Sequence, residues 1–239
     1  MLCFFIEGLD NVGKTTLIKR LADIYLECGY IPVIMHSDSK QDYFKLVQRI
    51  KDIFTEEYSS GAKYVIFLDR SWIDEFVYGQ IYRGRNELDV RKQICDIVDS
   101  LKTPPIVFNS YLGEGFTEDD IRAMWIDYIR DHFYEIYLQA STDFVLAHED
   151  NKSLSVTCTV SDSDRRKKIM NERVLFTKAM DINALFLDDS HRRTTTVQAG
   201  TSTKFKDKKY VIRDLGLPIV PACEADYIGN FLDNKGWII

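Results

Sequence analysis

Hydrophobic residues recur along the chain in short runs, separated by longer segments in which they repeat every three to four positions. Runs of strand length occur at residues 2–6, 31–35, 64–68, 105–108, 144–147 and 184–187. Segments with a helical period occur at residues 15–27, 43–54, 90–101, 119–138 and 165–180. This alternation predicts strands connected by helices. Several runs are apolar at nearly every position, which is typical of a parallel sheet covered by helices on both faces.

The last part of the chain departs from this alternation. Residues 188–209 are rich in Thr, Ser, Lys and Arg and are interpreted as a polar surface loop. The stretch KKYVIRDL that follows predicts a further strand, and EADYIGNFLDNKGW predicts an amphipathic helix. Since neither a repeat nor a low-complexity segment divides the chain, we expect residues 1–239 to form a single α/β domain.

The first predicted strand runs into GLDNVGKT, which satisfies the pattern G-x-x-x-x-G-K-[ST] at Gly8, Gly13, Lys14 and Thr15. A strand before the motif and a helix after it are the context in which the pattern predicts the phosphate-binding loop of a P-loop NTPase. Glycines let successive backbone N–H groups point at an anion, and the helix N-terminus adds partial positive charge. Lys14 is expected to bridge the β- and γ-phosphates, and the Thr15 hydroxyl to ligate Mg²⁺. The expected nucleotide-binding residues are Gly8, Asp10, Asn11, Val12, Gly13, Lys14, Thr15 and Thr16.

The third apolar run ends in the sequence DRSWIDEFVYGQIYRGR. The carboxyl ends of parallel strands form the edge at which ligands of such folds bind, so Asp69 is expected to reach Mg²⁺ or its water shell. Arg70, which follows directly, is expected to clamp a second phosphate in the same crevice.

These residues resemble the thymidylate kinase group of nucleoside monophosphate kinases, and DRSWIDEFVYGQ is similar to the versions in phage-encoded relatives. The resemblance covers the phosphate loop, the strand ending in Asp69-Arg70 and the helix through Tyr78. It implies a mobile lid, the use of ATP and Mg²⁺, and an Asp-Arg pair that serves magnesium and the acceptor's phosphate. It also places Asp10 near the 3′-hydroxyl of the acceptor. The substrate-binding residues that it implies are Asp10, Asp69, Arg70, Glu75 and Tyr78.

The sequence departs from this family where relatives read thymine. The small polar residues and the glutamine of the relatives are not matched: Asp74 and Glu75 stand after the motif, and Gly79 follows Tyr78. The usual Arg-Glu-Pro stretch after the second strand is replaced by HSDSKQDY. These differences leave the identity of the base open. Some relatives carry an arginine at the loop position of Asn11, and others supply that positive charge from the lid. Because Asn11 is uncharged, we expect this chain to belong to the second kind.

The densest basic cluster is SDSDRRKKIMNER, residues 161–173. If residues 144–147 form the fourth core strand, the lid lies within residues 149–173, and Arg165, Arg166 or Arg173 supplies the transition-state charge. If residues 105–108 form that strand, the lid comprises residues 112–122 and offers only Arg122. The density of charge favours the first alternative. The expected catalytic residues are then Lys14, Arg70, Arg165 and Arg166, while Arg83 and Arg85 either approach the acceptor or face solvent.

Net charge, cysteine spacing and the length of apolar runs limit the partners and the location that the sequence predicts. The net charge of −6 argues against a broad nucleic-acid or anionic-membrane surface, so small-molecule nucleotides are expected. The five cysteines lack metal-ligand spacing and are interpreted as free thiols of a reducing cytoplasm, the host's if the protein is viral. No apolar run approaches the roughly 20 residues of a membrane span, and no signal peptide is expected. The sequence leaves monomer and homodimer open.

Three functions are compatible with these patterns. The favoured one is transfer of the γ-phosphoryl group of ATP to a deoxynucleoside monophosphate, dTMP or a relative, to give the diphosphate. The alternative is a deoxynucleoside or DNA-hydroxyl kinase of the same fold, many of which carry Glu-Arg-Ser where this chain has DRS. A nucleotide-binding switch is the least favoured, because the sequence contains no guanine-reading Asn-Lys-x-Asp motif.

Overall fold

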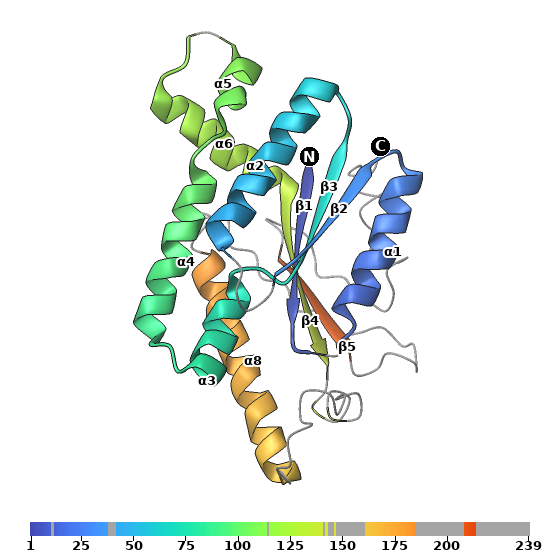
Figure 1. The fold of residues 1–239 in the computed structure, drawn as a ribbon, viewed down its shortest axis with the longest axis vertical. Helices are drawn as coiled ribbons and strands as arrows, with labels where there is room; N and C mark the ends of the chain where they lie inside the picture. Colours follow the sequence, from blue (N-terminus) through green and yellow to red (C-terminus); the bar gives the residue numbers. More distant parts are fainter. Residues whose placement is uncertain are drawn as a thin grey trace.

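The computed structural model describes residues 1–10, 12–37, 42–113, 115–140, 142, 146, 161–184 and 208–213. These residues form an α/β fold around one five-stranded sheet with the strand order β2-β3-β1-β4-β5 (Figure 1). The strands are β1 (Leu2–Gly8), β2 (Ile31–His36), β3 (Tyr64–Asp69), β4 (Phe133–Ala140) and β5 (Lys208–Arg213). β1 to β4 are parallel, and β5 pairs antiparallel with β4 at the edge. The predicted α/β class, the parallel sheet, the first three strands and the strand in KKYVIRDL are confirmed.

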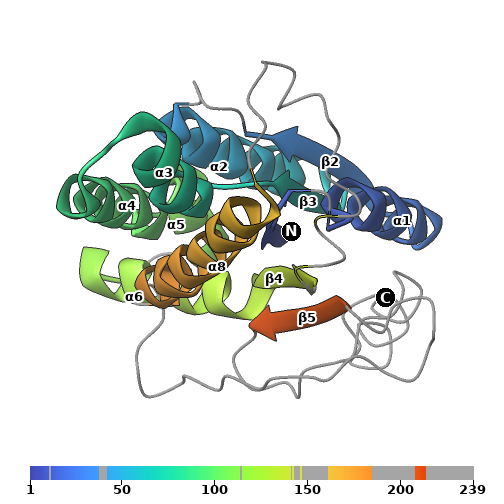
Figure 2. The same ribbon diagram turned by 90° about the horizontal axis from the view of Figure 1, so that it is seen from below.

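Helices lie on both faces of the sheet, as predicted. They are α1 (Lys14–Glu27), α2 (Tyr43–Ser60), α3 (Gln80–Arg83), α4 (Glu87–Lys102), α5 (Ile106–Leu112), α6 (Glu118–His132) and α8 (Asp162–Ala184), with a π-helical turn η1 (Glu75–Gly79) directly before α3. α1 covers one face, and α2, α3, α4 and α8 lie on the other (Figure 2).

The centre of the sheet is packed with aromatic side chains on both faces. Phe4 stacks on Phe67 and Tyr134 of the neighbouring strands, with ring centroids 5.4 and 5.1 Å away, and contacts Tyr25 of α1 at 5.7 Å. Phe5 points to the opposite face and packs against Trp72 at 5.2 Å. Because β1 is buried on both faces, it has no polar side to alternate with, which explains its continuous apolar sequence.

The prediction of one helix over residues 119–138 is wrong in its second half. α6 starts with a capping box between Thr117 and Asp120 and ends at His132, and the chain enters β4 at Phe133 without a turn residue between them. β4 lies between β1 and β5 and is buried on both faces along most of its length, so its sequence shows no period of two. β4 is the fourth parallel strand, in place of either run considered above.

The strand predicted at residues 105–108 is also wrong. Pro105 has extended backbone angles and stands at the N-cap of α5, a position that proline tolerates because no intrahelical N–H bond is needed there. The helix buries Phe108 against Phe54 and Trp125 and leaves Ile106 exposed. The strand assignment behind the lid at residues 112–122 is therefore wrong. The assignment of residues 144–147 as the fourth core strand, on which the lid at residues 149–173 was based, is wrong too, because β4 takes that place.

Other predictions fall partly or wholly outside the described residues. Of residues 144–147 only Leu146 is described, and of residues 184–187 only Ala184, which ends α8. Residues 188–207 and the predicted C-terminal helix lie outside. Cys3, Cys28 and Cys95 are free thiols, and Cys158 and Cys223 are not among the described residues. Every helix in the described part of the chain is too short or too polar to cross a bilayer.

Candidate functional site

The glycine loop, residues 8–15, joins the carboxyl end of β1 to the N-terminus of α1. Gly8 has φ = +139°, and a Cβ atom there would lie 2.5 Å from the carbonyl oxygen of Leu138 in β4. Gly13 adopts φ = +97° at the N-cap of α1. Both positions therefore require glycine. Of the remaining predicted nucleotide-binding residues, Val12 is buried, Thr16 is exposed and Asn11 lies outside the described residues.

Lys14 is folded into this loop. Its Nζ donates hydrogen bonds to the carbonyl oxygens of Gly8 at 2.7 Å and Leu9 at 2.8 Å. Burial lowers the pKa of the Lys14 ammonium, and the nearby Asp74 carboxylate opposes that shift. An anion entering the loop would offer this ammonium stronger acceptors than the two carbonyl oxygens.

Thr15 and Asp69, which the sequence assigned to a metal ion, are brought together. The Thr15 hydroxyl donates a 2.8 Å hydrogen bond to Oδ2 of Asp69 at the end of β3. His36, at the end of β2, places its Nδ1 3.5 Å from the same oxygen, a neighbour that the sequence gave no reason to expect. Hydroxyl and carboxylate oxygens are ligands that Mg²⁺ accepts. Among the described residues, no group of three or more His, Cys, Asp or Glu side chains forms a metal cluster.

Arg70, which directly follows Asp69, has a left-handed backbone, with φ = +75°. Its guanidinium forms an ion pair with Asp10 of the glycine loop, and its Nε lies 3.5 Å from Oδ2 of Asp74. Its Cζ lies 5.4 Å from the ring centroid of Tyr78. Asp10 from the glycine loop, and Asp74 and Tyr78 from the segment after β3, thus hold the Arg70 guanidinium in place.

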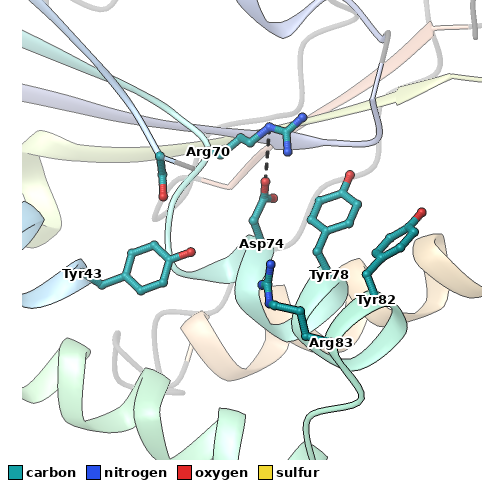
Figure 3. Close-up of a pocket in the computed structure, with 7 residues that line it drawn as sticks. Tyr43, Arg70, Asp74, Tyr78, Tyr82 and Arg83 are labelled. Carbon is teal, nitrogen blue, oxygen red and sulfur yellow. Dashed lines mark ion pairs between the residues drawn. The ribbon is translucent and has the colours of Figure 1, made fainter. Parts of the chain in front are cut away.

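That cation borders a cavity of about 200 Å³ at the carboxyl edge of the sheet (Figure 3). The lining side chains are Ser37, Tyr43, Arg70, Asp74, Tyr78, Tyr82 and Arg83. They come from the ends of β2 and β3, the start of α2, and the segment of residues 74–83. We call this cavity the Arg70 pocket.

The spacing of the lining residues follows from the helical segment after β3. Asp74, Tyr78 and Tyr82 are four residues apart, so the helical segment that includes η1 and α3 presents them along one stripe. π-Helical turns are rare and often occur at functional sites. The Tyr78 hydroxyl is buried and forms no hydrogen bond within the described part of the chain, so it can bond a ligand. Tyr78 was predicted from the sequence; Tyr82 was not.

Glu75, a predicted substrate-binding residue, and Glu7, which was not predicted, lie outside the lining of the Arg70 pocket. Glu75 forms ion pairs with Arg83, which lines the pocket, and with Arg85, which does not. Glu7, which the sequence reading missed, is fully buried in β1. Its burial and the neighbouring Asp74 raise the pKa of Glu7 well above its ordinary value. A carboxylate inside an otherwise apolar strand was the signal for it.

The candidate lid arginines lie on α8, whose N-terminal end extends past the carboxyl edge of the sheet (Figure 1). Arg165 and Arg166 belong to its first turns. Arg173 donates a 3.0 Å hydrogen bond to the Thr142 hydroxyl, just beyond β4. Residues 149–160 of the predicted lid lie outside the described residues.

Comparison with protein-family models gave no match, and comparison with curated proteins gave none either. The geometry of the glycine loop and of the Arg70 pocket is therefore what separates the candidate functions.

Proposed function

We propose that the protein transfers the γ-phosphoryl group of ATP to a deoxynucleoside monophosphate. The divergence of two adjacent side chains at the end of β3 supports this proposal. Asp69 is hydrogen-bonded to Thr15 of the glycine loop, and Arg70 borders a separate aromatic pocket. Adjacent Cα atoms are about 3.8 Å apart, so a phosphate at each side chain would lie at one edge of the sheet. A kinase needs this juxtaposition of donor and acceptor.

Each side chain then has a defined task. Lys14 exchanges its carbonyl partners for the β- and γ-phosphate oxygens of ATP. Thr15 and Asp69 would hold Mg²⁺, which when bound neutralises phosphate charge. Arg70 holds the acceptor's phosphate by charge-assisted hydrogen bonds. The tyrosines of the pocket pack against the nucleoside, and Asp10 lies near its 3′-hydroxyl.

In the transfer step, an oxygen of the acceptor's phosphate forms a bond to the γ-phosphorus, and the bond from that phosphorus to the β,γ-bridging oxygen breaks. The electron pair of the broken bond stays with ADP. The developing charge on the equatorial oxygens requires a cation beyond Lys14, which an arginine of α8 supplies.

A thermal-shift panel separates a monophosphate acceptor from a nucleoside acceptor. The full chain is titrated with deoxynucleosides and their 5′-monophosphates in the presence of a non-hydrolysable ATP analogue and Mg²⁺. A ligand that binds only the folded state raises the melting temperature by mass action. We expect the monophosphates to stabilise the protein and the nucleosides to have little effect, because nucleosides carry no phosphate for Arg70. Equal shifts for both series would contradict the proposal and favour a nucleoside kinase.

A further inference from the structure

Glu75, Gly79 and Arg83 form a second four-residue stripe on the helical segment of η1 and α3. The Glu75 carboxylate forms an ion pair with the Arg83 guanidinium eight residues later, passing over the position of Gly79. A Cβ atom at residue 79 would lie 2.6 Å from Oε1 and 3.1 Å from Cδ of Glu75. The ion pair is therefore possible in this geometry because residue 79 has no side chain.

A second arginine fixes the same carboxylate. Nη1 of Arg85 lies 2.8 Å from Oε1 of Glu75 and 2.7 Å from Oε1 of Gln93 in α4. The Arg85 backbone N–H also bonds the carbonyl oxygen of Gly79 at 3.0 Å. Only 7% of the Glu75 side chain is exposed. A buried carboxylate between two guanidinium groups is held in one place, and it holds Arg83 in turn.

Arg83 itself is part of the pocket wall, together with Arg70 (Figure 3). A guanidinium has five N–H donors, and the ion pair with Glu75 uses Nη2. Within the described part of the chain, the remaining donors have no other hydrogen-bond partner. Asp74, the acidic residue of the lining, has Oδ2 3.5 Å from Nε of Arg70, and neither of its carboxylate oxygens accepts a hydrogen bond from the described residues. The pocket thus has two cations. Arg70, after β3, can bind a phosphate, and Arg83, in α3, can bind another part of the ligand.

We propose that Arg83 determines which base the acceptor carries, by donating a hydrogen bond to a carbonyl oxygen at C4 of a pyrimidine or C6 of a purine. The acceptor class is then the monophosphates of keto bases: thymine, uracil or guanine. Cytosine and adenine carry an amino group at this position, which is itself a hydrogen-bond donor. The Arg83 guanidinium has no acceptor atom, so the two groups repel each other and these bases are disfavoured. This inference rests on the proposed function.

The test uses two pairs of ligands that differ in this group, dTMP with dCMP and dGMP with dAMP. Dissociation constants are measured by calorimetry on the full chain with a non-hydrolysable ATP analogue and Mg²⁺. We expect the wild-type protein to prefer the keto member of each pair by about ten- to a hundred-fold, as a charge-assisted hydrogen bond would give. In Arg83→Gln the preference should fall to within about twofold.

Gly79→Ala is the sharper variant, because it changes no side chain of the pocket. Gly79 has helical backbone angles (φ −61°, ψ −43°), in which alanine is favoured, so the fold should persist. The new methyl group displaces the Glu75 carboxylate and releases Arg83, so we expect the same loss of keto preference. Arg91→Ala, which removes a half-exposed guanidinium paired with Glu87 on α4, is the control and should behave as wild type.

The outcomes are distinguishable. If the wild-type protein prefers the amino bases, or if Arg83→Gln and Gly79→Ala retain the wild-type preference while still binding monophosphates, the role of Arg83 is wrong and the proposed function stands. If the wild-type protein binds no monophosphate, the proposed function fails and this inference fails with it.

Discussion

Arg70 adopts a left-handed backbone, and among the described residues it is the one non-glycine residue that does so. A side chain in this region costs about 1–2 kcal/mol relative to a right-handed conformation. Ion pairs with Asp10 and Asp74 and the ring of Tyr78 offset that cost and keep the guanidinium at the pocket. Arg70 and Asp69, although adjacent, thus have different partners: Asp10 and Asp74 for Arg70, and Thr15 for Asp69.

Replacing Arg70 by glycine and by alanine distinguishes strain from charge. Both variants lose the guanidinium, but only Arg70→Ala keeps the left-handed penalty, so we expect Arg70→Gly to be more stable by about 1 kcal/mol. Urea denaturation of the two variants measures this difference. Both should raise the KM for the monophosphate about ten- to a hundred-fold and leave that for ATP unchanged. A more stable alanine variant would refute the strain, and a change confined to the ATP constant would move Arg70 to the donor side.

Residues in the motifs could be placed from the sequence because their spacing defines a local structure. The glycine loop and the Asp69-Arg70 pair belong to this group. The contact between Glu75 and Arg83 could not be placed, since it depends on the space left by Gly79 and on the exact turn of the helix. Glu7 was missed because the predicted strand ended at Ile6, whereas β1 continues to Gly8.

At the scale of elements, the junction of α6 and β4 shows where sequence periodicity fails. The residues on both sides of His132 are aromatic and aliphatic, and neither glycine nor proline separates helix from strand. A strand buried on both faces resembles a buried helix in its composition, so the pattern extended the helix too far. With β4 ending at Ala140 and α8 starting at Asp162, the predicted lid at residues 149–173 begins after the fourth parallel strand and extends into the first half of α8.

An arginine of α8 should supply charge in the transition state. We expect alanine at one of Arg165, Arg166 or Arg173 to lower kcat by about 10³–10⁵ and to change the KM for ATP little, because the contact forms mainly in the transition state. Steady-state kinetics of the three single variants measures this effect. Arg122→Ala on α6 is the matched control. Normal turnover in all three variants would remove the role assigned to α8, and a defect in Arg122→Ala alone would move the lid to an earlier segment.

At the scale of the whole molecule, the parallel sheet gathers groups that are distant in the sequence at one edge. The glycine loop follows β1, His36 ends β2, and Asp69 ends β3 and is followed by Arg70. Because the carboxyl ends of these strands face the same way, the loop and the Arg70 pocket become neighbours without any further element between them. We expect these neighbours to hold the donor and the acceptor of one phosphoryl transfer.

The most direct test follows the phosphoryl group itself. The full chain is incubated with Mg²⁺, ATP labelled at the γ-phosphate and each of the four deoxynucleoside monophosphates in turn, and the products are separated by chromatography. We expect the label to appear in a deoxynucleoside diphosphate, with one ADP formed for each diphosphate and no transfer by a folded Lys14→Ala variant. Label released only as inorganic phosphate, label found only on a nucleoside supplied in place of the monophosphate, or unchanged transfer by Lys14→Ala would contradict the account.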